Sequence, residues 1–86
     1  MAAYEVKFAT SAAKEFRSLP LELKRRVGAV IDRLSQDPRP PGVRKLVGHE
    51  RLYRIRVGQY RVVYEVDDKE QLVRVTRIRH RREVYR

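Results

Sequence analysis

Apolar and polar residues in the first third of the chain follow two different periods. Residues 4–9 alternate between apolar and polar side chains, which predicts a β-strand. A short helix is predicted from an N-cap at Thr10-Ser11 to about Ser18, because Pro20 must end it. A longer helix is predicted over about residues 21–36. Its apolar residues form one stripe at the helical spacing: Leu23, Val27, Val30, Ile31 and Leu34.

Two alternating segments in the second half predict a β-hairpin. Residues 52–57 and 60–66 are separated only by Gly58-Gln59, and glycine at the first position of a two-residue loop is typical of a type II′ turn. That turn places Arg56 opposite Arg61 on one face, while the other face pairs only apolar and aromatic side chains. The turn and the hydrophobic pattern therefore support the same register.

A further strand is predicted over residues 72–79, after a polar turn. Val73 and Val75 alternate on one face, but Ile78 falls out of phase, so we expect a β-bulge near Thr76-Arg77. The order of elements predicts an α+β fold: an N-terminal strand, a two-helix hairpin and a three-stranded antiparallel meander, in one sheet with the helices on one face. We expect residues 1–86 to form a single domain.

The net charge of the chain indicates which kinds of partner it can bind. The net charge is +10, and 16 of the 21 basic residues are arginine, which points to RNA, DNA, an acidic protein or an anionic membrane surface. Cysteine is absent, which excludes disulfide frameworks, thiolate metal sites and cysteine nucleophiles. The N-terminus lacks the pattern of a signal peptide, and no apolar run is long enough to span a membrane. We expect a cytoplasmic protein.

The predicted register gathers arginines on one face of the sheet. Like charges directly opposite each other, as at Arg56 and Arg61, destabilise a sheet by roughly 0.2–1 kcal/mol. Arg54 lies on the same face, and the strand over 72–79 can add others, depending on the bulge. A planar guanidinium binds phosphate with two hydrogen bonds, so this face is interpreted as a phosphate-binding surface rather than as a merely solvated one.

The chain lacks the usual catalytic patterns, which leaves a metal-free reaction open. It has no histidine pair at metal-ligand spacing, no paired carboxylates, no P-loop and no nucleophile elbow. We therefore expect no cofactor and no metal. In RNA, however, the 2′-hydroxyl can attack its own phosphate, and arginines would stabilise the pentacoordinate intermediate. In the basic tail, Tyr85 or His80 could move a proton, since neighbouring cations favour a phenolate.

The whole chain resembles the RelE/ParE-type toxins of toxin–antitoxin pairs. The resemblance begins with the strand at Tyr4-Glu5-Val6 and the following Ala12-Ala13-Lys14-Glu15-Phe16. It continues through Lys45-Leu46-Val47-Gly48 and Leu52-Tyr53-Arg54-Ile55-Arg56. Its most specific parts are Tyr60-Arg61-Val62-Val63-Tyr64 and the ending His80-Arg81-Arg82-Glu83-Val84-Tyr85.

The resemblance implies an mRNA interferase of the RelE branch, which cuts mRNA in the ribosomal A site and is neutralised by an acidic antitoxin wrapped around it. The implied catalytic residues are Arg61, Arg81 and Tyr85. The residues expected to bind RNA are Arg54, Arg56, Lys45, Arg79 and His80. Arg79 is also the alternative to Arg81 for the family's C-terminal arginine.

Two other functions remain open at this point. ParE-type toxins share the fold but inhibit DNA gyrase by binding it, and they lack the full set of ribonuclease residues. A catalytically inactive relative would act only with its antitoxin, as a corepressor. The basic residues and the terminal Tyr85 of this chain favour the RelE branch.

Overall fold

The computed structural model describes residues 3–46, 48 and 51–80, which form two helices and a mixed sheet. The elements follow one another as β1 (Glu5–Phe8), α1 (Thr10–Arg17), α2 (Leu21–Gln36), β2 (Arg44–Lys45), β3 (Leu52–Val57), β4 (Tyr60–Asp67) and β5 (Leu72–His80). The strands lie in the order β1-β5-β4-β3-β2; β1 is parallel to β5, and the other neighbours are antiparallel. The predicted α+β fold is confirmed.

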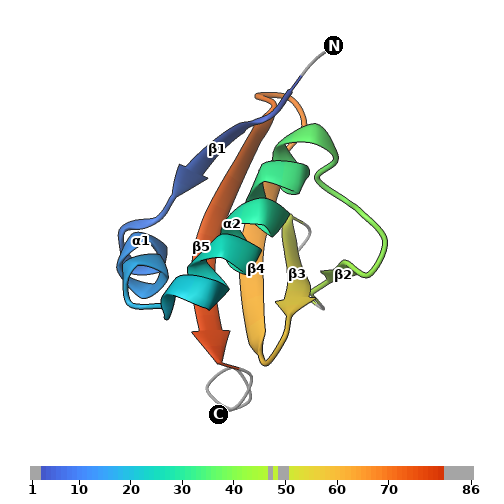
Figure 1. Cartoon of the computed structure of the whole chain (residues 1–86). Helices are drawn as coiled ribbons and strands as arrows, with labels where there is room; N and C mark the ends of the chain where they lie inside the picture. Colours follow the sequence, from blue (N-terminus) through green and yellow to red (C-terminus); the bar gives the residue numbers. More distant parts are fainter. Residues whose placement is uncertain (1–2, 47, 49–50, 81–86) are drawn as a thin grey trace.

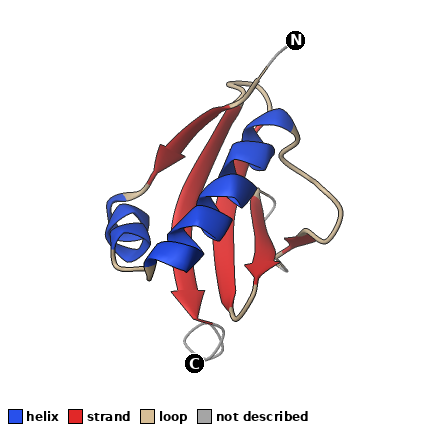
Figure 2. Cartoon of the chain, viewed as in Figure 1, coloured by secondary structure: helices blue, strands red, loops and turns tan. Residues whose placement is uncertain are grey.

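The two helices occupy different places beside the sheet (Figure 1). The longer helix α2 crosses one face of the sheet, and α1 lies beside β5, beyond the end of β1 (Figure 2). The predicted bounds of α2 are confirmed. The predicted N-cap of α1 is wrong: Ala9 precedes the first turn and gives no side-chain cap, while the Ser11 hydroxyl donates to the Thr76 carbonyl at 3.4 Å.

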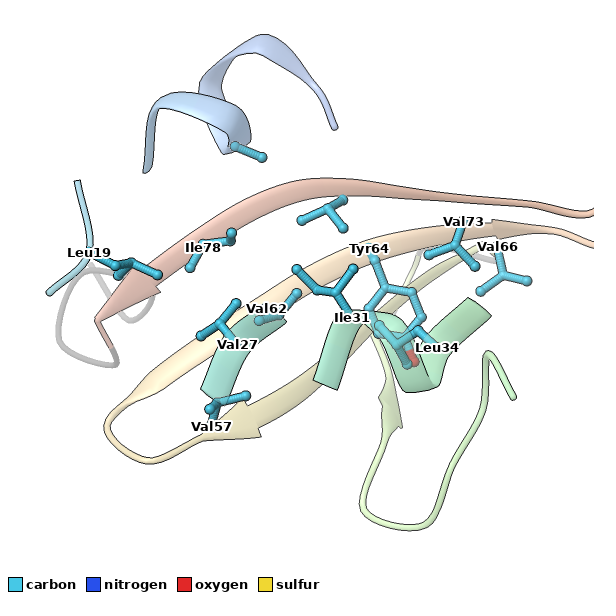
Figure 3. Close-up of a cluster of buried hydrophobic side chains, with 12 residues drawn as sticks. Leu19, Val27, Ile31, Leu34, Val57, Val62, Tyr64, Val66, Val73 and Ile78 are labelled. Atoms are coloured by element: carbon cyan, nitrogen blue, oxygen red, sulfur yellow. The ribbon is translucent and has the colours of Figure 1, made fainter. Parts of the chain in front are cut away.

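The core lies between α2 and the covered face of the sheet (Figure 3). Helix α2 contributes Val27, Ile31 and Leu34 to it, all of them buried. The largest fully buried side chain is Tyr64 of β4, whose hydroxyl donates to the Pro38 carbonyl at 2.7 Å. Burial raises the pKa of Tyr64, so its hydroxyl remains a donor at every physiological pH. This bond holds the segment between α2 and β2, residues 37–43, against the centre of the sheet; we call this segment the connector.

The predicted bulge in β5 is confirmed, and it decides which side chains reach the open face. Val63 pairs with Arg77, but the next residue of β4, Tyr64, pairs with Val75, so Thr76 is the extra residue. The Thr76 hydroxyl donates to the Val63 carbonyl at 3.1 Å. A regular strand would carry the next arginines into the core after Val75, because side chains alternate. The bulge instead sends them to the face opposite α2.

Strand β2 was not predicted from the sequence. It contains only Arg44 and Lys45, which pair with Arg54 and Tyr53 of β3. Two exposed basic residues show no alternation of apolar and polar positions, so the sequence gives no strand signal there. This short edge strand brings one more arginine to the sheet.

A polar network fastens the connector before β2 to the far end of the sheet. The two Nη atoms of Arg39 donate to the Asp68 carboxylate at 3.1 and 2.8 Å, and its Nε donates to the Tyr53 hydroxyl at 3.0 Å. The Tyr4 hydroxyl donates to the same carboxylate at 2.7 Å. These bonds hold the pKa of Asp68 at about 2 and raise the pKa of Tyr4.

This network predicts a loss of stability in acid. A carboxyl whose folded pKa is lowered adds stability above its unfolded value of about 3.9 and loses that contribution as the pH falls through the folded value. The melting temperature of the wild type should therefore fall more steeply than that of Asp68→Asn from about pH 4 to about pH 2. The exposed Asp32→Asn serves as control and should keep the wild-type slope. Equal slopes for the wild type and Asp68→Asn would mean that the network does not lower the pKa of Asp68.

Candidate functional site

A row of arginines crosses three strands on the face of the sheet opposite α2. Arg56 of β3 lies opposite Arg61 of β4, and Arg61 lies opposite Arg79 of β5. Directly opposed residues in antiparallel strands point to the same side of a sheet. The pairing therefore places three guanidinium groups side by side, as the turn at Gly58 predicted for the first two.

A second row lies next to the first one. Arg44 of β2 is opposite Arg54 of β3, and Arg54 is opposite Val63 of β4. Val63 in turn is opposite Arg77 of β5. The side chains of both rows form one cationic surface, which we call the arginine face: Arg44, Arg54, Arg56, Arg61, Arg77 and Arg79. The bulge at Thr76 is responsible for the last two, since it changes the phase of β5.

A hollow opens on the arginine face beside β2. Its volume is about 280 Å³, and the described residues that line it are one glycine and four arginines. They are Gly42, Arg44, Arg54, Arg56 and Arg61. Guanidinium groups offer only hydrogen-bond donors and keep their charge at any physiological pH. The hollow therefore suits an anion with several acceptor oxygens, such as a phosphodiester.

Arg61 is at the centre of the row and is buried. Only 5% of its surface is exposed, whereas Arg56 beside it is exposed. Arg56 and Arg79 lie beside it on the neighbouring strands, and like charges directly across a sheet repel one another. A row of arginines that is kept at this cost is typical of a surface that binds an anion. Arg61 is thus the central residue of the candidate site.

One carboxylate from helix α1 reaches the other end of the row. The Glu15 Oε1 atom accepts the backbone N–H of Ile78 at 2.8 Å, and its Oε2 accepts the Nε–H of Arg79 at 2.9 Å. Oε2 also lies 3.5 Å from an Nη atom of Arg77. Glu15 was not predicted as a site residue, since nothing in a helical residue's spacing shows that it will meet a strand more than sixty residues later.

The structure brings some of the predicted site residues together and separates others. Arg54, Arg56, Arg61 and Arg79 lie on the arginine face as predicted. Arg44 was missed, because its place depends on the unpredicted β2. The predicted catalytic residues Arg81 and Tyr85 lie outside the described residues.

Lys45 and His80 lie on the side of the sheet that α2 covers. Lys45 pairs with Tyr53 and lines a separate hollow of about 390 Å³ together with Arg39 and Asp68. The ring of His80 packs edge-on against Tyr60, with the ring centres 5.3 Å apart. Neither side chain joins the arginine face, so their binding of RNA stays a prediction that needs a different path for the RNA.

Two further observations concern the described part of the chain. Among residues 3–46, 48 and 51–80, no three histidine, aspartate or glutamate side chains converge as metal ligands would. Neither of the helices described there is long and apolar enough to cross a membrane. A site made of arginines acts through charge and hydrogen bonding.

Comparison with known proteins decides the family. The family model described as the ParE toxin of type II toxin–antitoxin systems matches residues 6–85. The chain belongs to the RelE/ParE toxin family. As a member of that family it is the toxin of a toxin–antitoxin system, and the resemblance seen in its sequence is confirmed.

Relatives of this toxin carry RelE-type names. Toxin RelG of Mycobacterium tuberculosis is 33% identical over 96% of this chain and 97% of its own length. Toxin RelE3 of Methanocaldococcus jannaschii is 29% identical, with 94% of each chain covered.

Solved structures agree with these relatives. The isolated E. coli RelE toxin superposes with a TM-score of 0.83 at 31% identity, with 96% of this chain and 92% of RelE covered. The archaeal RelE–RelB complex from Pyrococcus horikoshii contains a chain that superposes with a TM-score of 0.82 at 35% identity, with 94% and 97% covered.

Proposed function

We propose that this toxin is a metal-independent endoribonuclease that cleaves mRNA in the ribosomal A site. The observation that carries the proposal is the cross-strand row of Arg56, Arg61 and Arg79, with Arg61 buried at its centre. Such a row stabilises the doubly charged phosphorane that forms when the 2′-hydroxyl of RNA attacks the adjacent phosphate. The products are a 2′,3′-cyclic phosphate and a free 5′-hydroxyl. DNA has no 2′-hydroxyl, so the substrate is RNA.

The arginines that line the hollow have two different roles, RNA binding and catalysis. Arg44, Arg54 and Arg56 hold the RNA backbone through phosphate contacts that do not depend on sequence. Arg61 contacts the phosphate that reacts, because a phosphate bound beside it also lies close to the cations of Arg56 and Arg79 on the neighbouring strands. Arg81 adds charge to the same transition state. Codon preference must then come from the ribosome and from how the mRNA is presented.

Tyr85 orients the 2′-hydroxyl or accepts its proton. Arginines cannot do this, since a guanidinium does not give up its proton in proteins. Within the described residues, no carboxylate lines the hollow beside Arg61. A phenol in the basic tail therefore supplies the proton chemistry, aided by cations that favour its phenolate form.

Removal of the Tyr85 hydroxyl tests this role. Tyr85→Phe is expected to lower the rate of mRNA cleavage about 100-fold, the usual effect of losing a general base. Binding to the ribosome should change little, because the arginine face remains. The single-turnover cleavage rate on programmed ribosomes is the measurement. A folded Tyr85→Phe protein that cleaves at the wild-type rate would remove Tyr85 from the mechanism.

An acidic antitoxin is the second partner. Several of the solved relatives are complexes named RelE–RelB or RelBE. Our chain has a net charge of +10, and its described part exposes the large apolar side chains Phe8 and Leu21. A partner with negative charge and apolar anchors would cover both kinds of surface. Cleavage of mRNA places the active toxin in the cytoplasm, where the ribosomes are.

Inhibition of DNA gyrase is the alternative function, and the name of the matching family model favours it. In that case the arginine face would bind an acidic protein surface instead of RNA. The two functions differ in their first effect after induction. Intact mRNA together with a DNA-damage response would support gyrase inhibition. Rapid loss of mRNA with intact DNA would support cleavage.

A further inference from the structure

Glu15 occupies a position on α1 that core packing does not explain. Strand β1 pairs with β5 only as far as Phe8 and Val75, and the Ala9 N–H then bonds to the Val75 carbonyl. Beyond that point α1 replaces β1 as the neighbour of β5. The Glu15 carboxylate takes the place of a strand carbonyl and accepts the N–H of Ile78.

The same carboxylate holds the side chain of the following residue. Its second oxygen accepts the Nε–H of Arg79 at 2.9 Å, so one rigid group binds the backbone at Ile78 and the guanidinium at Arg79. A free arginine side chain loses roughly 2 kcal/mol of rotamer entropy when a ligand immobilises it. Glu15 removes most of this cost before any ligand arrives.

The hydrogen bond to Glu15 uses only the Nε–H of Arg79 and leaves its two Nη groups available to a ligand. Glu15 takes the Nε–H, and within the described residues neither Nη atom of Arg79 makes a hydrogen bond. About a third of the Arg79 side chain is exposed, at 37%. Arg79 lies directly opposite the buried Arg61. Its two Nη groups can therefore donate to a phosphate bound next to Arg61.

We propose that Glu15 is a positioning residue, which presents Arg79 to the RNA phosphate beside Arg61. This inference rests on the proposed function and goes further in two respects. It makes Arg79 a phosphate ligand whose orientation is fixed from outside the site. It also assigns a role in RNA binding to an acidic residue, which by charge alone would only weaken that binding.

Glu15→Gln separates the backbone contact of the carboxylate at Ile78 from its contacts with the guanidinium groups of Arg79 and Arg77. The amide oxygen of glutamine can still accept the Ile78 N–H, but the amide nitrogen would then meet the Nε–H of Arg79, and two donors do not bond. Glu22→Gln is the matched control, because it removes the same charge from an exposed residue at the start of α2. Both variants should melt within a few degrees of the wild type.

The sign of the change in RNA affinity distinguishes positioning from simple charge. The probe is a 2′-O-methyl RNA oligonucleotide, which cannot be cleaved, and binding is followed by fluorescence anisotropy. Positioning predicts that Glu15→Gln binds about tenfold more weakly than the wild type. Charge alone predicts tighter binding, as expected for Glu22→Gln. Wild-type or tighter binding by Glu15→Gln would overturn the inference.

A double-mutant cycle shows whether Glu15 acts through Arg79. Glu15→Gln should have no further effect on affinity in an Arg79→Ala background, because the group that it positions is gone. An equal tenfold loss in that background would mean that Glu15 acts through the strand or through Arg77, and it would overturn the inference.

The cleavage assay separates this inference from the proposed function. If Arg79→Ala cleaves mRNA normally while Arg61→Ala does not, the ribonuclease activity and the role of Arg61 stand, while the positioning of Arg79 and its share in stabilising the phosphorane are wrong. If the wild type fails to cleave mRNA, the proposed function is wrong, and the affinity cycle still decides whether Glu15 positions Arg79. A second readout is the Nε–H resonance of Arg79 in NMR spectra. Its exchange with water should be slowed in the wild type and in Glu22→Gln, and fast in Glu15→Gln.

Discussion

Arg61→Ala should lower mRNA cleavage about 1,000-fold, which is the size of effect seen when a preorganised donor to a transition-state oxyanion is removed. The arginine is buried to 5% exposure between Arg56 and Arg79, and water that enters the space left by alanine carries no charge and cannot replace the guanidinium. Its charge is fixed in place before RNA binds and needs no rearrangement during the reaction. The loss should therefore appear in the catalytic rate and not only in affinity.

Arg25→Ala is the matched control for this experiment. Arg25 is exposed on α2, on the other side of the sheet, and its loss changes the net charge by the same amount. It should cleave within about twofold of the wild type, as expected for a surface substitution away from the site. If the two alanine variants lose activity equally, general charge and not the position of Arg61 governs cleavage.

A second variant at the same position shows that the defect is not one of folding. Arg61→Met keeps most of the side-chain volume and the aliphatic stem and removes the charge, so the space beside β3 and β5 stays filled. Its circular dichroism spectrum should remain that of a folded protein, while its cleavage activity is lost. A folded Arg61→Met protein that cleaves mRNA would contradict the account.

Tyr64→Ala should destabilise the protein by about 4 kcal/mol, as for other large aromatic side chains that are fully buried. The ring has no exposed surface and stacks on Tyr53, with the ring centres 5.9 Å apart. Most small domains are stable by only about 5–15 kcal/mol, so at the low end of that range this loss would leave roughly 1 kcal/mol and a measurable unfolded fraction. The free energy of unfolding from urea titration is the measurement.

Tyr64→Phe isolates the hydroxyl from the ring. It removes the hydrogen bond to the Pro38 carbonyl and leaves that carbonyl without its donor, which should cost about 1–3 kcal/mol. The connector after Pro38 leads to Gly42 and Arg44 of the hollow, so a loosened connector should also weaken RNA binding. Equal stability of Tyr64→Phe and the wild type would mean that the bond does not hold the connector.

The hairpin that carries the site was predictable because it is local. Two residues form its turn, and Gly58 has the positive φ of +60° that the first position of a type II′ turn requires. The alternation of apolar residues then allows one register only, since a slip by one residue would exchange the two faces. Arg56 and Arg61 follow from these two facts.

The parts that were missed depend on contacts between distant segments. Arg44 joins the site because a two-residue strand is added at the edge of the sheet, and Glu15 joins it because α1 packs beside β5. Lys45, next to Arg44, was expected at the site, yet adjacent residues of a strand point to opposite faces. His80 lies on the covered side for the same reason, one residue after Arg79. The pattern of apolar and polar residues predicts which face of the sheet a side chain occupies only where the strand itself can be recognised from the sequence.

Primer extension on a translated mRNA after induction of the toxin tests most directly whether the toxin cleaves mRNA in the ribosomal A site. The wild type should give new 5′ ends within minutes, phased with the codons of the reading frame and absent from untranslated regions. Arg61→Ala should give none, and Arg25→Ala should give the wild-type pattern. Growth arrest by the wild type with intact mRNA would mean that the toxin does not act by cleaving mRNA.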